Sequence, residues 1–174
     1  MITNAGIYEK RNSPCGLHIE NGKKLLPLNL KNAPGNFYLK PNGVFLIQDG
    51  KAQIMESHNY AKANLKPELA IQSGPLLLQN GKIHPKFNKD SKSKLLRSGL
   101  GINKNNEVVF TITSKGEQVN LYAFASLFKA LGCTDALFLD GVISQMETDE
   151  PVTHKTDFAA MFAIYSTTPP RPKQ

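Results

Sequence analysis

Asp140 is the residue of this sequence best placed to carry out chemistry. It follows the apolar run "DALFL" and precedes Gly141, so it stands directly after a predicted buried strand. The backbone holds a carboxylate firmly at the end of a strand, and open sheets form ligand crevices at such ends. The glycine permits a sharp turn or the close approach of a ligand to the backbone. A plain strand-terminating Asp-Gly turn explains the same two residues, so Asp140 alone does not define a site.

Three other stretches share the form of "LDGVIS" at 139–144, with a polar residue beside a small-residue turn at the edge of an apolar run. They are "TNAG" near the start, "IQSGP" at 71–75 and "RSGLGI" at 97–102. The last stretch begins with Arg97, whose planar guanidinium is suited to bidentate binding of phosphate. Each stretch is weak evidence by itself, whereas the four in this order and at these separations form a specific pattern.

This pattern resembles the phosphodiester glycosidase family. Members show an Asn-x-Gly near the start of the domain, a Gly-Pro before a hairpin, an Arg-x-x-x-Gly strand and a closing Leu-Asp-Gly-Gly-x-Ser. The resemblance runs from about Thr3 to Tyr165, and "GNFYLKPNGVF" and "LGCTDALFLDG" are especially similar to the bacterial branch. It implies a hydrolase of glycosyl phosphodiesters and, because bacterial members are often exported, an exported or periplasmic location.

The sequence departs from the family pattern at two points. Val142 stands where members have a second glycine, so a position suited to positive φ or close substrate approach carries a β-branched side chain. Members also carry sequence ahead of the Asn-x-Gly motif, whereas three residues precede Asn4 here. Both departures keep open an alternative, a non-catalytic module that binds phosphoglycans or cell-envelope polymers on the same scaffold.

The substrate class implied by the resemblance assigns roles to the residues. Cleavage at an anomeric carbon normally needs one acid and one base or nucleophile. A phosphate monoester, with a second pKa of about 6, leaves as a stable anion, so one carboxylate and one cation suffice. The hypothesis makes Asp140 the nucleophile or base and Arg97 the group that binds phosphate, with Asn4 in the same catalytic set. The remaining candidates are the polar positioning residues Asn4, Ser73 and Ser144 and the ligand-facing glycines Gly6, Gly74 and Gly141.

No cofactor is expected, although the residues leave a divalent cation open. The histidines show no metal-type spacing with one another; they are His18, His58, His84 and His154. A cation bound by Asp140, Glu147 or Asp149 remains an alternative, and Glu147 could also serve as a second carboxylate. Cys15 and Cys133 lie far apart without metal-ligand spacing, and two idle thiols are one interpretation of them. A single disulfide between them is the alternative, open if the protein works in an oxidising compartment.

The net charge of +7 is concentrated in the basic loop, residues 82–97, where five lysines and one arginine face a single acid, Asp90. A solvated loop and an electrostatic funnel toward a small anionic substrate both explain it. Nucleic acid is a weaker interpretation because the loop offers one aromatic stacking platform, Phe87. The expected partner is therefore a small-molecule or glycan phosphodiester. No membrane span or signal peptide is recognisable, and oligomeric state and location stay undetermined by the residues themselves.

Turn signals and one helical pattern indicate the elements that must position these groups. Type I′ hairpin turns are predicted at Asn21-Gly22, Asp49-Gly50 and Asn80-Gly81, and a further hairpin turns through Asn103–Asn106. An amphipathic helix is expected at about 119–131, capped by Asn120 and ended by Gly132, with a minor helix from Ser57 to Leu65.

The run "DALFLDG" predicts a central strand, and we expect "FAAMFAIYS" at 158–166 to be its buried neighbour. The predicted fold class is α+β, a mixed, largely antiparallel β-sheet system built from hairpins with one main and one minor helix. Residues 1–166 are expected to form a single domain, and residues 167–174 a Pro-rich disordered tail.

Overall fold

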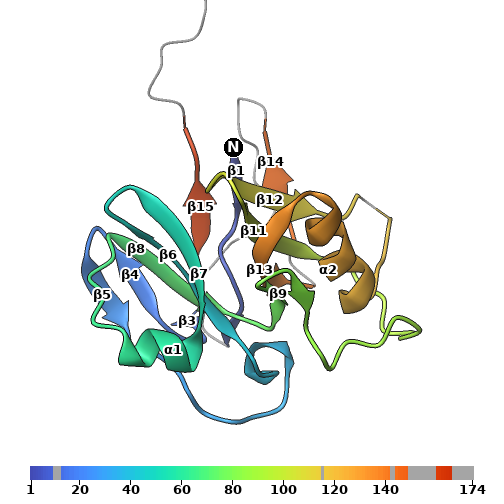
Figure 1. The fold of residues 1–174 in the computed structure, drawn as a ribbon, viewed down its shortest axis with the longest axis horizontal. Helices are drawn as coiled ribbons and strands as arrows, with labels where there is room; N and C mark the ends of the chain where they lie inside the picture. Colours follow the sequence, from blue (N-terminus) through green and yellow to red (C-terminus); the bar gives the residue numbers. More distant parts are fainter. Residues whose placement is uncertain (10–12, 115, 142–143, 149–159, 166–174) are drawn as a thin grey trace, which may run out of the picture.

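Two five-stranded sheets form the centre of the fold (Figure 1). The structure is a computed structural model that describes residues 1–9, 13–114, 116–141, 144–148 and 160–165. The first sheet has the order β5-β4-β8-β6-β7, with β4 His18–Glu20, β5 Lys23–Leu26, β6 Gly43–Gln48, β7 Lys51–Glu56 and β8 Leu69–Ser73. The second has the order β10-β9-β13-β11-β12, with β9 Leu76–Gln79, β10 Lys82–Ile83, β11 Ser98–Asn103, β12 Val108–Ile112 and β13 Cys133–Asp140. Strand pairs within both sheets are antiparallel.

The predicted hairpin turns are confirmed. Asn21 and Gly22 join β4 to β5 with φ of 50° and 72°, and the pairs Asp49-Gly50 and Asn80-Gly81 adopt the same positive values between β6 and β7 and between β9 and β10. Two consecutive residues at positive φ are the signature of a type I′ turn, which matches the twist of the strands. In the turn between β11 and β12, Asn106 has φ 61°.

Three buried clusters show how the layers pack. One cluster lies between the two sheets and includes Phe45 and Ile71 from the first and Leu137 and Leu139 from the second. Another packs the outer face of the second sheet, with Phe138 of β13, against the main helix. The third lies on the outer face of the first sheet. Because alternate residues of β13 face the other sheet and the helix, both of its faces are buried, which explains why "ALFL" shows no polar face.

The main helix, α2, spans Leu121–Ala130, and its cap is the predicted Asn120, whose side chain accepts a hydrogen bond from the backbone N–H of Ala123. The minor helix, α1, spans Ser57–Lys62, three residues shorter at its end than predicted. The chain that follows α1 returns toward the first sheet, since Lys66 donates its backbone N–H to Gln48 Oε1 at 2.9 Å. Among the described residues, no helix has the length and apolar character needed to cross a membrane.

The pairing expected for residues 158–166 is wrong. The strand in this region, β15 Met161–Ala163, pairs with β1 Ile2–Asn4, which pairs on its other side with β14 Met146–Glu147. The neighbours of β13 are instead β9 and β11. Burial in β15 alternates, so that Phe162 is buried and Met161 is 46% exposed. Alternate residues of a strand point to opposite faces, so in β15 only the face that carries Phe162 packs against the protein. The sequence did not predict this alternation, because the residues on both faces of the strand are apolar.

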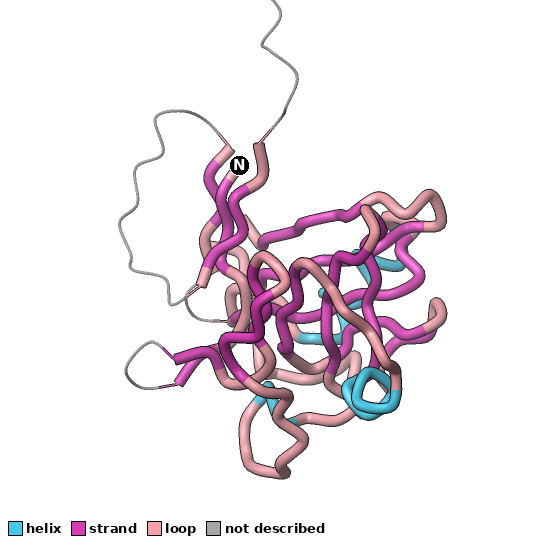
Figure 2. The backbone as a smooth tube through the Cα atoms, turned by 90° about the vertical axis from the view of Figure 1, so that its left-hand side faces the viewer, coloured by secondary structure: helices cyan, strands magenta, loops and turns pink. Residues whose placement is uncertain are grey.

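The small sheets complete the fold. Figure 2 shows the three strands of the β14-β1-β15 sheet side by side next to the N-terminus. A two-stranded ribbon pairs β2 Tyr8–Glu9 with β3 Ser13–Pro14, and a 3-10 helix, η1, spans Asn36–Tyr38. Residues 158, 159 and 166 and the predicted tail at 167–174 lie outside the described residues.

Candidate active site

Asp140 is the last residue of β13 and pairs with Ser98, the first residue of β11. The next pair is Gly99 with Phe138, so Leu139 is an extra residue on the β13 side and forms a β-bulge. Bulges bend a strand and redirect its side chains, and they are frequent beside active sites. Asp140 is partly exposed, as a carboxylate that meets a ligand must be.

Ser98 links three of the predicted site residues. Asn4 Nδ2 donates a hydrogen bond to Ser98 Oγ at 2.9 Å, and Ser144 Oγ donates to the same oxygen at 3.1 Å. Ser144 Oγ also lies 3.0 Å from the backbone oxygen of Asp140, a second acceptor for the same hydroxyl group. Asn4 and Ser98 are 2% and 1% exposed, so their hydrogen bond is internal, whereas Ser144 is partly exposed. This polar network holds the end of β1 against the end of β13, which brings residues from both ends of the chain to one place.

Arg97 is buried directly beside this network, with 1% of its surface exposed. Its Nε donates to the backbone oxygen of Val119 at 3.2 Å, and its Nη2 donates to that of Ser93 at 3.3 Å. The guanidinium carbon lies 5.4 Å from the centre of the Phe138 ring, within the range of a cation–π contact. The remaining nitrogen, Nη1, has no hydrogen-bond partner among the described residues.

The guanidinium adjoins the Asp140-Gly141 turn. A Cβ atom added at Gly141 would lie 2.9 Å from Arg97 Nη1, so a glycine here leaves room for the guanidinium where it lies. Burial lowers the pKa of Arg97, and the negative charge of Asp140 opposes this effect. The group nevertheless remains charged, because arginine keeps its proton in proteins. A buried cation with an N–H that makes no hydrogen bond destabilises the folded protein unless an anion binds to it.

The negative charge of Asp140 also acts on Cys15, the residue that directly follows the β2–β3 ribbon. The pKa of the Cys15 thiol is raised to about 11, first by burial and then by the negative charges of Glu9 and Asp140. The Tyr38 hydroxyl donates to Glu9 Oε1 at 3.2 Å. The sequence did not predict that three further residues lie near the candidate site, because short irregular segments position them: Glu9, Cys15 and Tyr38. Ser98 was also missed, although it directly follows Arg97 in the motif "RSGLGI".

The other predicted residues lie around Ser73, at the end of β8. Ser73 is fully buried, and its Oγ lies 3.5 Å from the backbone oxygen of Leu139. Gly6 meets it, because a Cβ at Gly6 would lie 3.5 Å from Ser73 Oγ. A Cβ at Gly74 would lie 2.5 Å from Asn42 Cβ, so the small size of Gly74 serves packing within the protein. The motifs "TNAG" and "IQSGP" therefore converge beneath the end of β13.

The described residues contain no group of three histidines, cysteines or acidic residues that could hold a metal ion. Glu147 lies in β14 opposite Ile2, while Asp149 and Val142 fall outside the described residues. Cys15 and Cys133 are both free thiols, and Cys133 is buried in the cluster beneath α2.

Comparison with known proteins agrees with this arrangement of motifs. Residues 1–157 match the sequence profile of the phosphodiester glycosidase family. The chain belongs to this family. A relative from Escherichia coli (strain K12), the uncharacterized protein YigE, is 40% identical over 147 residues, which are 84% of this chain and 57% of that protein. The chain thus spans little more than half the length of this relative.

The fold is also shared with a solved phosphodiester glycosidase. The catalytic domain of zebrafish N-acetylglucosamine-1-phosphodiester alpha-N-acetylglucosaminidase, auto-inhibited by its pro-peptide, superimposes with a TM-score of 0.59 at 17% identity, over 81% of this chain and 50% of that chain. A hypothetical protein from Synechocystis gives a TM-score of 0.46 at 16% identity, over 81% of this chain and 45% of that one.

Within this phosphodiester glycosidase fold, the candidate site offers three chemical components. Asp140 supplies a partly exposed carboxylate, and Arg97 supplies a buried cation whose Nη1 has no hydrogen-bond partner among the described residues. Ser98 links Asn4 to Ser144 and so braces the strand ends that carry them. A planar guanidinium is suited to binding phosphate, and a carboxylate can act as a nucleophile or a base.

Proposed function

We propose that this protein hydrolyses glycosyl phosphodiesters by breaking the bond between the anomeric carbon and the phosphate oxygen. The observation that carries the proposal is the buried Arg97 guanidinium, whose unused Nη1 lies against the Asp140-Gly141 turn. Membership of the phosphodiester glycosidase family supports the same reaction. The similarity to the zebrafish enzyme suggests N-acetylglucosamine as the first sugar to test.

Arg97 binds the phosphodiester in this proposal. A shift of the adjoining Asp140-Gly141 turn uncovers the buried Nη1, and a non-bridging phosphate oxygen then accepts a hydrogen bond from it. Nε and Nη2 stay bonded to the backbone at Val119 and Ser93. The cation is therefore held in place before the substrate arrives, and it neutralises the charge that develops on the leaving phosphate. Its position in the protein interior strengthens this interaction relative to one in water.

Asp140 acts at the anomeric carbon, either as the nucleophile or as the base that activates water. The phosphate monoester departs with the electron pair of the carbon–oxygen bond, and because it is a stable anion it needs no separate acid. Water supplies the hydroxyl group to the sugar, and its proton passes through the carboxylate to solvent. The network of Asn4, Ser98 and Ser144 acts as a positioning group that keeps the end of β13 in place.

The test is hydrolysis of the methyl diester of N-acetylglucosamine 1-phosphate, followed by measurement of the free sugar. We expect Asp140→Asn to lower kcat by about a thousandfold or more. Arg97→Lys should lower kcat/KM by about a hundredfold, since a single ammonium cannot keep both backbone bonds and still donate to phosphate. In 18O-labelled water the label should enter the sugar, which places the break at the carbon–oxygen bond.

The matched control is Asp49→Asn, an isosteric change in the hairpin turn between β6 and β7, which should leave the rate unchanged. Full activity of Asp140→Asn would rule out the assigned role of this carboxylate. If the parent protein binds the diester tightly without releasing sugar, and Asp140→Asn binds it equally well, the protein is instead a non-catalytic binding module.

A further inference from the structure

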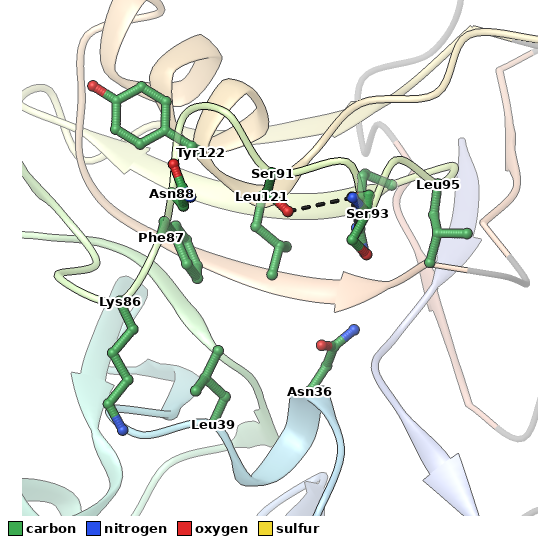
Figure 3. Close-up of a pocket in the computed structure, with 11 residues that line it drawn as sticks. Asn36, Leu39, Lys86, Phe87, Asn88, Ser91, Ser93, Leu95, Leu121 and Tyr122 are labelled. Carbon is green, nitrogen blue, oxygen red and sulfur yellow. Dashed lines mark hydrogen bonds between the residues drawn. The ribbon is translucent and has the colours of Figure 1, made fainter.

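Arg97 also lines a pocket of about 170 Å³, which we call the side pocket (Figure 3). Its walls come from residues 86–95 of the basic loop, from the first turn of α2 and from Asn36 and Leu39. Figure 3 shows Phe87 and Leu121 on one side of the gap, with Asn36 and Leu39 across from them. The pocket is therefore built from three separate parts of the chain, and Arg97 connects it to the candidate active site.

The side chains that line the side pocket carry a net positive charge. Eleven described residues line it, and none of them is acidic, whereas Lys86 and Arg97 are cationic. Leu121 and Tyr122, which begin α2, lie in its wall, so the N-terminal end of the helix, where the dipole is positive, borders the pocket. The independent sign of a ligand is the nearly fully buried Arg97 side chain in the same wall, with Nη1 unpartnered among the described residues.

Hydrogen bonds within the protein hold the walls of the side pocket together before any ligand binds. Asn120 Nδ2 donates to the backbone oxygen of Lys89 at 2.9 Å and to that of Ser91 at 3.0 Å. Its Oδ1 accepts from the N–H of Ala123 at 2.8 Å, so one side chain joins the basic loop to the start of α2. Walls held in place in this way lower the ordering cost of binding.

We propose that the side pocket is the subsite for the aglycone, the group on the far side of the phosphodiester from the sugar, and that it selects aglycones that carry a further phosphate. This inference rests on the proposed function. A diester held by Arg97 directs one of its two substituents along the guanidinium into the pocket. The carbon skeleton of that substituent packs on Phe87 and Leu121, and its phosphate meets Lys86 and the N-terminus of α2. The substrate is then one unit of a phosphate-linked chain or a small phosphorylated diester.

The experiment compares two diesters that share the scissile bond. One joins N-acetylglucosamine 1-phosphate to glycerol, and the other carries an additional phosphate on the terminal glycerol hydroxyl. We expect the parent protein to show a KM about tenfold lower for the second, because a hydrogen bond to a charged group is worth more than one to a neutral group. Lys86→Gln should remove most of this preference, so that the KM values for the two diesters become similar. Lys66→Gln, which changes an exposed lysine outside the pocket, should keep the full preference.

Binding of both diesters to Asp140→Asn, measured by calorimetry, separates this inference from the proposed function. A tenfold tighter affinity for the phosphorylated diester that Lys86→Gln abolishes supports the subsite, even if the parent protein cleaves neither compound. Equal affinities for the two diesters would overturn the subsite while leaving cleavage intact. A preference that survives Lys86→Gln would overturn the role of this lysine and of the pocket. If the preference extends to a trimer of phosphate-linked units, a polymer is the source of the ligand.

Discussion

At the scale of single residues, the distinctive feature of the site is that two opposite charges act on each other across the end of β13. Burial lowers the pKa of Arg97, and the negative charge of Asp140 acts in the opposite direction. The same charge also raises the pKa of Cys15, which directly follows the β2–β3 ribbon. The carboxylate is thus electrostatically coupled both to the proposed phosphate-binding group and to a thiol. The reactivity of this thiol therefore reports on the negative charge of Asp140 without a measurement of catalysis.

Cys15 should react slowly with iodoacetamide. With a pKa of about 11, only about one thiol in a thousand is ionised at pH 8, and the thiolate is the reactive form. Replacing Asp140 by Asn removes a negative charge that raises this pKa, so the thiolate fraction and the alkylation rate should increase a few fold. Peptide mapping by mass spectrometry separates Cys15 from the buried Cys133. An unchanged rate in Asp140→Asn, equal to that of Asp49→Asn, would show that Asp140 does not act on the thiol.

At the scale of elements, α2 both covers the second sheet and anchors the basic loop. The cap residue Asn120 accounts for the anchoring, since it bonds to the loop carbonyl oxygens at Lys89 and Ser91 as well as to the helix. The basic loop is therefore more than a solvated run of lysines, because its backbone is attached to a helix end. The isolated bridge between Leu95 and Val119 adds a further attachment.

Two substitutions at Asn120 separate these contributions to stability. Asn120→Ala loses the cap and both loop bonds, and we expect the free energy of unfolding to fall by about 2 kcal/mol. Asn120→Ser keeps a good capping oxygen but lacks the amide donors, so it should lose about 1 kcal/mol. Urea denaturation followed by circular dichroism measures both values. Equal losses in the two variants would mean that the loop bonds contribute the whole effect and the cap none.

At the scale of the whole molecule, the β14-β1-β15 sheet joins the ends of the chain to the central core. Phe162 of β15 makes edge-to-face contacts with Phe45 of the first sheet at 5.7 Å and with Phe110 of the second at 5.4 Å. The same strand pairs with β1, which carries Asn4 into the site. Packing of a single aromatic ring in the core therefore contributes to the position of Asn4, which belongs to the network that positions the end of β13.

Phe162→Ala should destabilise the protein by about 3 kcal/mol, since it leaves a cavity between the two sheets. For a chain of this size, this corresponds to a Tm lowered by about 6 to 12 °C in a thermal scan. Met161→Ala, which truncates the adjacent side chain with 46% exposure, should shift the Tm by no more than about 2 °C. Similar shifts for both variants would indicate that β15 does not dock Phe162 into the core.

The sequence by itself determined the local features of this protein. Turn chemistry at pairs such as Asn21-Gly22 and the capping of α2 by Asn120 depend on neighbouring residues, so their physical causes can be read along the chain. The motif around Asp140 was recognisable only together with three other stretches of the sequence, through their order and separations. Only the tertiary structure decided which strands pair, that β15 joins β1, and that Arg97 is buried with an unused N–H beside Gly141. These depend on contacts between residues far apart in the chain, and an apolar run such as that around Phe162 fits more than one neighbour.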